Sequence, residues 1–301
     1  MKILVTGADG MVGSALCPVL RERGHDVVAT DALPTSHETT KLDIRDPAAV
    51  MAVCEQVSPT LVIHLAAATD VDRCELEPDY AYVNNAVGTE RMVQAARAVR
   101  ARLLYMSTAG VFDGEKTTPY VESDAPNPVN VYGRSKLIGE YAVQQYTGHY
   151  QIVRASWMVG GFERDKKFVA KVLHLLEDRQ ELTVVTDKIG SLTFTTDLSR
   201  GIAALLETQE TGIFHMANQG ACSRYDVACE IVKSLGRNDV TVRPITSDAF
   251  PLPAPRAASE VLENRRLRAL GMDTMPSWQQ SLHAYVKRYM SAVSVAPRGR
   301  Q

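Results

Sequence analysis

A tyrosine and a lysine lie four positions apart in the stretch Tyr132-Gly133-Arg134-Ser135-Lys136. In a helix this spacing puts the two side chains on one face. A free tyrosine has a pKa of about 10, and a neighbouring ammonium group lowers that pKa because it favours the phenolate. The pair can therefore donate or accept a proton near neutral pH, as a general acid or base does.

Two hydroxyl residues, Ser107 and Thr108, directly follow the apolar run Leu103–Met106. If that run is a strand of a parallel sheet, both hydroxyls lie at its carboxyl end, where ligands bind in such sheets. A hydroxyl at this place can bind the substrate oxygen that receives the proton of Tyr132. Each hydroxyl alone is equally consistent with a strand-end cap, but the combination with Tyr132 and Lys136 favours catalysis.

A second motif is rich in glycine and occupies residues 7–13, directly after the apolar run Lys2–Thr6. In a dinucleotide-binding turn the first glycine permits the tight turn and the second lets the backbone approach a pyrophosphate. The third lets helix and strand pack closely. The following helix supplies free N–H groups and the positive end of its dipole. We therefore expect the pyrophosphate to contact Gly7, Gly10, Met11, Val12 and Gly13.

An acidic residue, Asp31, follows the next predicted strand, His25–Thr30. A carboxylate at this place accepts hydrogen bonds from the ribose hydroxyls of adenosine, and it repels the 2′-phosphate of NADP. No Lys or Arg lies between Asp31 and Lys41 to offset this repulsion. The sequence therefore favours NAD(H) and leaves NADP(H) as the alternative. An aspartate that only caps a turn is the structural interpretation of the same residue.

Alternating strands and helices must hold these groups in place. The predicted strands are Lys2–Thr6, His25–Thr30, Leu61–Leu65, Leu103–Met106 and Tyr150–Arg154. The predicted helices run from the glycine turn to Arg23, then over Pro47–Gln56, Pro78–Arg100 and Val131–Tyr146. Apolar strands separated by helices indicate a parallel sheet covered on both faces. Right-handed crossovers make it a doubly wound α/β sheet of the Rossmann type.

The second half of the chain is less regular and predicts a smaller C-terminal substrate-binding lobe. Its predicted helices are Phe168–Asp178, Thr196–Glu207 and Ser223–Leu235, and its predicted strands are Leu182–Val185 and Gly212–Met216. We assign residues 1–153 to the dinucleotide-binding domain, with returning segments near 182–217, and residues 154–181 and 218–290 to the smaller lobe. We expect Pro244–Pro255 to be a surface loop and residues 292–301 to be disordered.

Charge and composition exclude several classes of protein. The chain has 301 residues, and 33 Lys and Arg against 35 Asp and Glu give a net charge of −2. This balance argues against a nucleic-acid protein that works through a basic field. The 5 cysteines are scattered without a CxxC pair, so we expect neither a disulfide framework nor a metal site. Without a signal-peptide layout or an apolar run of ~18 residues, we expect a cytoplasmic protein with no membrane contact.

Together these motifs resemble the extended short-chain dehydrogenase/reductase family, within the NAD-dependent epimerase/dehydratase superfamily. The resemblance extends to about residue 285, and residues 62–68 and 85–89 add further matches. It implies that His64 is a structural residue of its strand. It also implies that Asp43 contacts the adenine amino group, although a turn aspartate is an equally good interpretation. The further cofactor contacts that it implies are Ile44, Ala66, Ala67, Ala68, Asn85 and Ser107.

Within this family the chain resembles the dTDP-4-dehydrorhamnose reductases, through residues 106–114, 132–140, 154–157 and 187–198. This resemblance implies that Thr108, Tyr132 and Lys136 are catalytic. It implies a sugar pocket lined by Thr69, Val71, Thr108 and Trp157. Arg256 lies in a segment that loosely resembles the family's substrate loop, and an arginine there can pair with a diphosphate. The structural alternatives are core packing for Trp157 and a solvated loop position for Arg256.

The chain departs from the reductase pattern at two places. Reductases of this type usually have Asp-Tyr after the catalytic threonine, whereas this chain has Ala109-Gly110, which leaves the sugar open. The same change weighs against a 4,6-dehydratase, because that reaction needs an Asp-Glu pair there. Ala15 stands where some family members have a metal-binding glutamate, so we expect no metal and no metal-linked dimer. Another kind of homodimer stays open.

The function that these observations predict is an NAD(P)H-dependent reductase of a nucleotide-activated 4-keto-6-deoxyhexose. Hydride would reach C4 of the sugar, and Tyr132 would donate the proton. One rival is an NDP-sugar 4-epimerase, which shares these residues but retains its NAD. The other is a non-catalytic regulatory subunit of the same fold. The implied partner is a small nucleotide sugar rather than a nucleic acid or a membrane.

Overall fold

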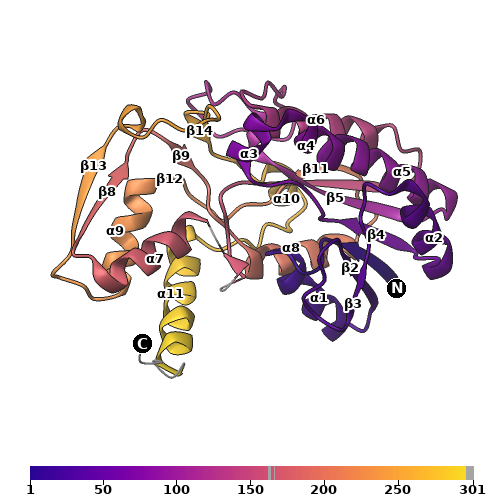
Figure 1. Cartoon of the computed structure of the whole chain (residues 1–301), viewed down its shortest axis with the longest axis horizontal. Helices are drawn as coiled ribbons and strands as arrows, with labels where there is room; N and C mark the ends of the chain where they lie inside the picture. Colours follow the sequence, from indigo (N-terminus) through magenta and orange to yellow (C-terminus); the bar gives the residue numbers. More distant parts are fainter. Residues whose placement is uncertain (162–163, 166, 296–301) are drawn as a thin grey trace.

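The computed structural model describes residues 1–161, 164–165 and 167–295. Within them, a sheet of 7 parallel strands has the order β11-β6-β5-β4-β1-β2-β3 (Figure 1). Its strands are β1 (Lys2–Thr6), β2 (Asp26–Asp31), β3 (Thr39–Lys41), β4 (Leu61–His64), β5 (Arg102–Thr108), β6 (Tyr150–Ala155) and β11 (Gly212–His215). The inner strands β1 and β4 are buried along almost their whole length, as strands covered on both faces must be. The predicted doubly wound α/β fold is confirmed.

The strand order changes direction at β1, which pairs with β2 on one side and with β4 on the other. In doubly wound sheets ligands bind at this switch point, beside the carboxyl ends of the strands. The glycine motif follows β1 and residues 65–68 follow β4, so both segments meet there. The topology therefore brings together two segments that are far apart in the sequence.

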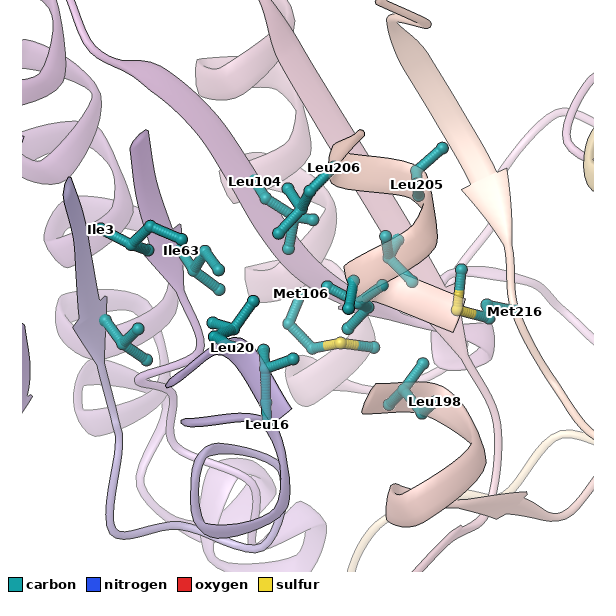
Figure 2. Packing of buried hydrophobic residues seen from close by; sticks show 14 of the residues in the cluster. Ile3, Leu16, Leu20, Ile63, Leu104, Met106, Leu198, Leu205, Leu206 and Met216 are labelled. Carbon is teal, nitrogen blue, oxygen red and sulfur yellow. The ribbon is translucent and has the colours of Figure 1, made fainter. Parts of the chain in front are cut away.

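Helices cover both faces of the sheet. On one face lie α1 (Gly13–Glu22) and α8 (Thr195–Leu206), and on the other lie α2 (Pro47–Val57), α5 (Gly88–Ala98) and α6 (Val131–Gln144). Figure 2 shows the first face, where strand residues Ile3, Ile63 and Leu104 meet helix residues Leu16, Leu20 and Leu198. Each of these fully buried side chains contributes about 1.5–3 kcal/mol relative to exposure. This packing holds the carboxyl edge of the sheet in a fixed arrangement.

The segment predicted as one helix over Pro78–Arg100 is divided in the structure. Helix α4 (Pro78–Tyr82) passes through a π-helical turn, η1 (Val83–Val87), into α5. Such turns often occur at functional sites, and this one contains Asn85. A short helix of 6 residues, α3 (Val71–Leu76), precedes it. It was not predicted because so few residues cannot show a helical period.

The smaller lobe lies at the left of Figure 1, at the end of the molecule away from strands β2 and β3. Its helices are α7 (Phe168–Asp178), α9 (Arg224–Ser234) and α11 (Trp278–Val295), which pack around a second apolar core. Short strand pairs complete it, formed by β7 (Met158–Val159), β8 (Glu181–Val185), β9 (Ile189–Gly190), β10 (Thr193–Phe194), β12 (Cys222–Ser223), β13 (Thr241–Ile245) and β14 (Ser259–Glu260). Helix α10 (Arg265–Ala269) packs against β11 of the large sheet.

The structure differs from the sequence-based expectation at several places in this half. Strand β8 pairs with β13 instead of returning to the large sheet, whereas β11 does return. The end of β13 and a short 3-10 turn, η4 (Ser247–Ala249), occupy part of the segment predicted as a loop.

Helix α11 was not predicted, and it runs to Val295. The predicted disorder is therefore wrong for residues 292–295, while residues 296–301 lie outside the described residues. The reason is tertiary, because Leu282, Tyr285 and Val286 on this helix pack into the apolar core of the smaller lobe. The local sequence does not show that partner.

No helix in the described part of the chain is both long enough and apolar enough to cross a membrane. No group of 3 or more His, Cys, Asp or Glu side chains in that part of the chain is arranged to hold a metal ion.

Candidate functional site

The glycine motif folds into a turn that two of its glycines make necessary. Gly7 has φ +69°, and a Cβ there would lie 2.7 Å from the backbone N of Ala66. A Cβ on Gly13 would lie 2.4 Å from the carbonyl O of Ala8. By contrast, Gly10 is exposed, and a Cβ there would meet only the carbonyl O of Gly7, at 3.2 Å. The fold itself therefore requires Gly7 and Gly13, whereas Gly10 leaves room for a ligand to approach the backbone.

Helix α1 begins directly after this turn, and no side chain caps its N-terminus. Its first N–H groups and the positive end of its dipole therefore point toward the switch point, as in anion-binding turns. Met11 and Val12 are partly buried at this place. The turn and the uncapped helix fit the pyrophosphate of a dinucleotide.

Asp31 ends β2 beside the turn and is partly exposed. Its Oδ2 accepts a hydrogen bond from the backbone N–H of Asp9 at 3.2 Å, and its Oδ1 accepts one from Leu33 at 3.0 Å. The carboxylate thus holds the glycine turn and retains oxygen lone pairs for further donors. The structure accommodates both interpretations of Asp31, as a turn residue and as a ribose contact.

One cation reaches this edge of the sheet from the second half of the chain. Arg164 donates to Oγ1 of Thr35 at 3.1 Å, and the Thr35 N–H donates to the Asp9 carboxylate. Burial alone would raise the pKa of Asp9, but hydrogen bonds from Thr35 and Thr39 and the charge of Arg164 outweigh it and lower this pKa. The residues that follow Asp31 in the sequence give no sign that Arg164 reaches this edge of the sheet.

Asp43 and Ile44, the predicted adenine contacts, differ in environment. Asp43 forms a salt bridge with Arg45, Oδ2 to Nη2 at 2.6 Å, and hydrogen bonds from Arg45 lower its pKa. Ile44 is buried against Gly88, where a Cβ would approach its Cδ1 to 2.8 Å. Ile44 thus packs helix α5 onto the sheet, while Asp43 stays at the surface.

The segment Ala66–Ala68 is held from below by Asn85. The Asn85 Oδ1 accepts a hydrogen bond from the Ala68 N–H at 2.7 Å, and its Nδ2 donates to the Ala68 carbonyl at 3.0 Å. Nδ2 also donates to Oγ of Ser135 on α6 at 3.0 Å. Because Asn85 is 0% exposed, it connects the Ala66–Ala68 segment to the helix that carries Tyr132.

His64 at the end of β4 is buried and bonded on both ring nitrogens. Nδ1 lies 2.7 Å from Oγ1 of Thr6, and Nε2 lies 3.1 Å from Oγ1 of Thr89. Burial, with a smaller effect of the Lys136 charge, lowers its pKa to about 3. A neutral, fully bonded ring serves the packing of the strands, as the sequence analysis expects.

Tyr132 lies in the first turn of α6, beside Thr108 at the end of β5. Asn130 caps this helix, since its Oδ1 accepts a hydrogen bond from the Gly133 N–H at 2.8 Å. Thr108 lies close enough to the Tyr132 phenol to oppose the rise in its pKa, and Thr108 Oγ1 accepts a hydrogen bond from the Gly110 N–H at 3.0 Å. A Cβ on Gly110 would lie 3.6 Å from Cδ1 of Tyr132. The bare Gly110 therefore leaves space directly beside the phenol.

The protonation of Tyr132 differs from the sequence-based expectation. Burial and, to a smaller extent, the negative charge of Glu260 raise its pKa to about 12, against the opposing effect of Thr108. Lys136 Nζ instead donates to the Met106 carbonyl at 2.8 Å, and burial lowers the lysine pKa to about 7. The expectation that Lys136 lowers the pKa of the phenol is therefore wrong for the protein alone. The phenol therefore holds its proton at neutral pH.

A buried ion pair supports this site from beneath. Glu140, one turn beyond Lys136, accepts hydrogen bonds from Arg154 Nε at 2.8 Å and Nη2 at 2.6 Å. Ser107 Oγ donates to the same carboxylate at 2.5 Å. Ser107 thus faces this ion pair, which ties α6 to strands β5 and β6.

The predicted substrate residues are spread along the junction of the two lobes. Thr69 is exposed, and its carbonyl accepts a hydrogen bond from Lys167 Nζ at 3.1 Å. Val71 begins α3 and is partly buried. Arg256 Nη2 pairs with Asp72 Oδ1 at 2.9 Å, and its Nη1 donates to the Ala254 carbonyl at 2.8 Å. Arg256 is thus already paired within the protein.

Trp157 contacts two residues that the sequence analysis did not single out. Its Nε1 donates to Oε2 of Glu260 at 2.6 Å, and the Arg224 guanidinium lies 3.6 Å above its ring. A Cβ on Gly190 would come within 2.4 Å of the indole, so the ring packs directly on β9. No motif marks Glu260 or Arg224, and only tertiary packing brings them to Trp157.

The family model described as RmlD substrate binding domain matches residues 1–291. A relative named dTDP-4-dehydrorhamnose reductase, from Mycolicibacterium smegmatis, is 36% identical over 98% of this chain and 88% of its own length.

Two solved structures are similar over nearly their whole length. The dTDP-4-dehydrorhamnose reductase from Clostridium acetobutylicum is 37% identical with a TM-score of 0.89, over 98% of this chain and 100% of that one. The reductase of the same name from Bacillus anthracis, solved in complex with NADP, is 34% identical with a TM-score of 0.87, over 97% of this chain and 99% of that one.

Proposed function

Because this chain belongs to the RmlD substrate-binding domain family, we propose that it is an NAD(P)H-dependent reductase of a nucleotide-activated 4-keto-6-deoxyhexose. The relatives named dTDP-4-dehydrorhamnose reductase support dTDP-4-dehydrorhamnose as the substrate to test. In the proposed reaction the C4 carbonyl becomes an alcohol, and one hydride and one proton are added.

The observation that carries this proposal is the position of Thr108 beside Tyr132 at the carboxyl edge of the sheet, where a Cβ on Gly110 would lie 3.4 Å from Thr108 Oγ1 and 3.6 Å from Tyr132 Cδ1. Because burial raises the pKa of Tyr132 to about 12, the phenol holds its proton at neutral pH. A carbonyl oxygen that meets both hydroxyls is polarised by two hydrogen bonds. As negative charge develops on that oxygen, Tyr132 transfers its proton to it, which is general acid catalysis.

Lys136 and the glycine turn have roles in binding in this proposal. We expect Lys136 Nζ, which donates to the Met106 carbonyl in the protein alone, to bind ribose hydroxyls of the cofactor, and the uncapped α1 to bind the pyrophosphate. The other expected contacts are Asp43 and Ile44 for the adenine, and Ala66, Ala67 and Ala68 along the switch point. When bound, the reduced nicotinamide supplies the hydride.

We propose NADH as the preferred cofactor. Asp31 puts a carboxylate where the 2′-phosphate of NADPH would lie, and Asp9 adds a second negative charge at the same turn. Arg164 contacts Thr35 beside this turn, and its positive charge acts on Asp9. NADPH binding remains open, since the Bacillus anthracis relative was solved in complex with NADP.

The sugar nucleotide would lie between the lobes, beside Tyr132. Thr69, Val71 and Trp157 are the proposed contacts to the sugar, and Arg256 to the diphosphate. Since Arg256 is paired with Asp72, diphosphate binding by this residue would require that the guanidinium share or exchange its carboxylate partner.

The experiment that tests the function measures oxidation of NADH and NADPH with dTDP-4-dehydrorhamnose, in wild type and in Tyr132→Phe. We expect the variant to lose roughly a hundredfold to ten-thousandfold in kcat, because it lacks the proton donor, and to bind cofactor normally. Tyr141→Phe is the matched control, since Tyr141 lies on the same helix and is 50% exposed. Near-normal turnover in Tyr132→Phe would refute the assignment. Conversion of sugar without added NAD(P)H would favour the epimerase instead.

A further inference from the structure

Glu260 is held rigidly at the edge of the proposed sugar pocket. It lies in β14, which pairs in parallel with β9, and its carbonyl accepts a hydrogen bond from Ser156 Oγ at 2.9 Å. Its carboxylate Oε2 accepts the indole N–H of Trp157 at 2.6 Å. Trp157 in turn packs on Gly190 of β9. Backbone pairing and an indole hydrogen bond thus fix one carboxylate oxygen of Glu260.

The second carboxylate oxygen of Glu260, Oε1, is free for another donor. Within the described part of the chain it has no hydrogen-bond partner, and the side chain is partly exposed. Arg224 lies over the same indole at 3.6 Å and carries a positive charge beside the carboxylate without a direct ion pair among the described residues. A carboxylate fixed by one oxygen presents the other as an acceptor of defined direction.

The segment that carries Glu260 packs against the Tyr132 region, since Leu262 shares an apolar cluster with Ala109 and Asn130, the cap of the Tyr132 helix, donates to the Pro255 carbonyl at 3.0 Å. The negative charge of Glu260 accordingly helps to raise the pKa of the phenol. A substrate whose carbonyl meets Tyr132 therefore brings its neighbouring ring positions near Glu260. Next to the Tyr132 ring, Gly110 and the preceding Ala109 offer no polar side chain. The sugar hydroxyls consequently lack a side-chain acceptor there.

We propose that Glu260 is a specificity residue that accepts a hydrogen bond, through Oε1, from the sugar hydroxyl adjacent to the carbonyl. This inference rests on the proposed reductase function and adds to it a requirement on the substrate. The keto sugar must carry a free hydroxyl next to its carbonyl. A carboxylate in place of that hydroxyl would be rejected, because two negative charges would meet in the pocket.

The test compares wild type and Glu260→Gln with two substrates, one that has the hydroxyl next to the carbonyl and one that lacks it. Glutamine can keep its oxygen on the Trp157 N–H, but then presents an amide donor in place of the acceptor. We expect KM for dTDP-4-dehydrorhamnose to rise about tenfold to a hundredfold, as for loss of a hydrogen bond to a charged group, with KM for the cofactor unchanged. With an analogue that has hydrogen in place of the hydroxyl, wild type and variant should have equal KM.

Two further variants complete the experiment. Glu263→Gln is the control, because Glu263 pairs with Arg265 and Arg268 at the surface, and its kinetics should match wild type. Trp157→Phe keeps a ring but removes the N–H that fixes Glu260, so KM for the sugar should rise by a smaller factor.

An unchanged KM in Glu260→Gln, or the same loss with both substrates, would overturn the inference. If the wild-type protein reduces no keto sugar nucleotide, the proposed function fails, which is a separate result.

Discussion

The buried ion pair between Glu140 and Arg154 should be one of the strongest supports of the catalytic edge. Its partners are 0% and 2% exposed, and two hydrogen bonds of 2.6 and 2.8 Å join them. Glu140→Gln removes the negative charge and leaves the guanidinium inside the protein. The same carboxylate accepts a hydrogen bond from Ser107 Oγ at 2.5 Å, directly before Thr108, the residue proposed to bind the substrate carbonyl.

The expected cost follows from this burial. Breaking one partner of a buried pair costs about 3–5 kcal/mol, because the remaining charge is uncompensated. With an unfolding entropy of roughly 2 cal/mol/K per residue, this loss lowers Tm by roughly 5–8 °C for a chain of 301 residues. Replacing both partners with apolar residues of similar volume, as in Glu140→Leu with Arg154→Met, should recover most of that free energy.

Thermal and urea unfolding measure these free energies for Glu140→Gln, for Glu140→Leu and Arg154→Met each alone, and for the Glu140→Leu, Arg154→Met double variant. Arg23→Met is a suitable control, because its salt bridge with Glu207 is at the surface and should contribute about 0–1 kcal/mol. Two results would refute this reasoning: a Glu140→Gln variant as stable as wild type, or additive effects of the two apolar replacements on the free energy of unfolding. Either would show that the cost does not come from leaving one buried charge without its partner.

Three further predictions concern the cofactor and the catalytic lysine. Gly10→Ala should fold normally but bind cofactor weakly, whereas Gly13→Ala should lose stability, since its Cβ would meet backbone at 2.4 Å; unfolding and cofactor titrations separate the two. Asp31→Asn should shift selectivity toward NADPH by about tenfold, and unchanged kcat/KM ratios would argue against repulsion. Burial lowers the pKa of Lys136 to about 7, so Lys136→Met should stabilise the protein most below pH 7 and progressively less as pH rises toward the unfolded pKa of 10.5. Equal gains at pH 6 and pH 9 would contradict this.

Much of the site was predictable because its motifs are local. Spacing alone puts Tyr132 and Lys136 on one helix face, and the glycine turn needs only a strand before it and a helix after it. The helix over Phe168–Asp178 was predicted with its observed bounds, since its apolar period is visible in the sequence. These features depend on neighbours within a few residues.

Other parts could not be predicted from local pattern. Asn85 falls within the helix predicted over Pro78–Arg100, yet it lies in a π turn, fully buried, and joins Ala68 to Ser135. Helix α11 carries apolar residues at helical spacing, among them Trp278, Leu282 and Tyr285, but the sequence does not show that their partners are in the core of the smaller lobe. In both cases the deciding contacts come from distant parts of the chain.

The sequence by itself determined the fold class, the dinucleotide turn and the identity of the Tyr132 and Lys136 pair, because these follow from residue type and short spacing. Tertiary structure decided that Arg164 reaches Thr35 and that Glu260 meets Trp157, although 129 and 103 positions separate these residues. It also decided the protonation of Tyr132. Spacing predicts that the ammonium lowers the pKa of the phenol, but burial raises the pKa of Tyr132 and lowers the pKa of Lys136. Desolvation depends on everything packed around a group, and no stretch of sequence contains that information.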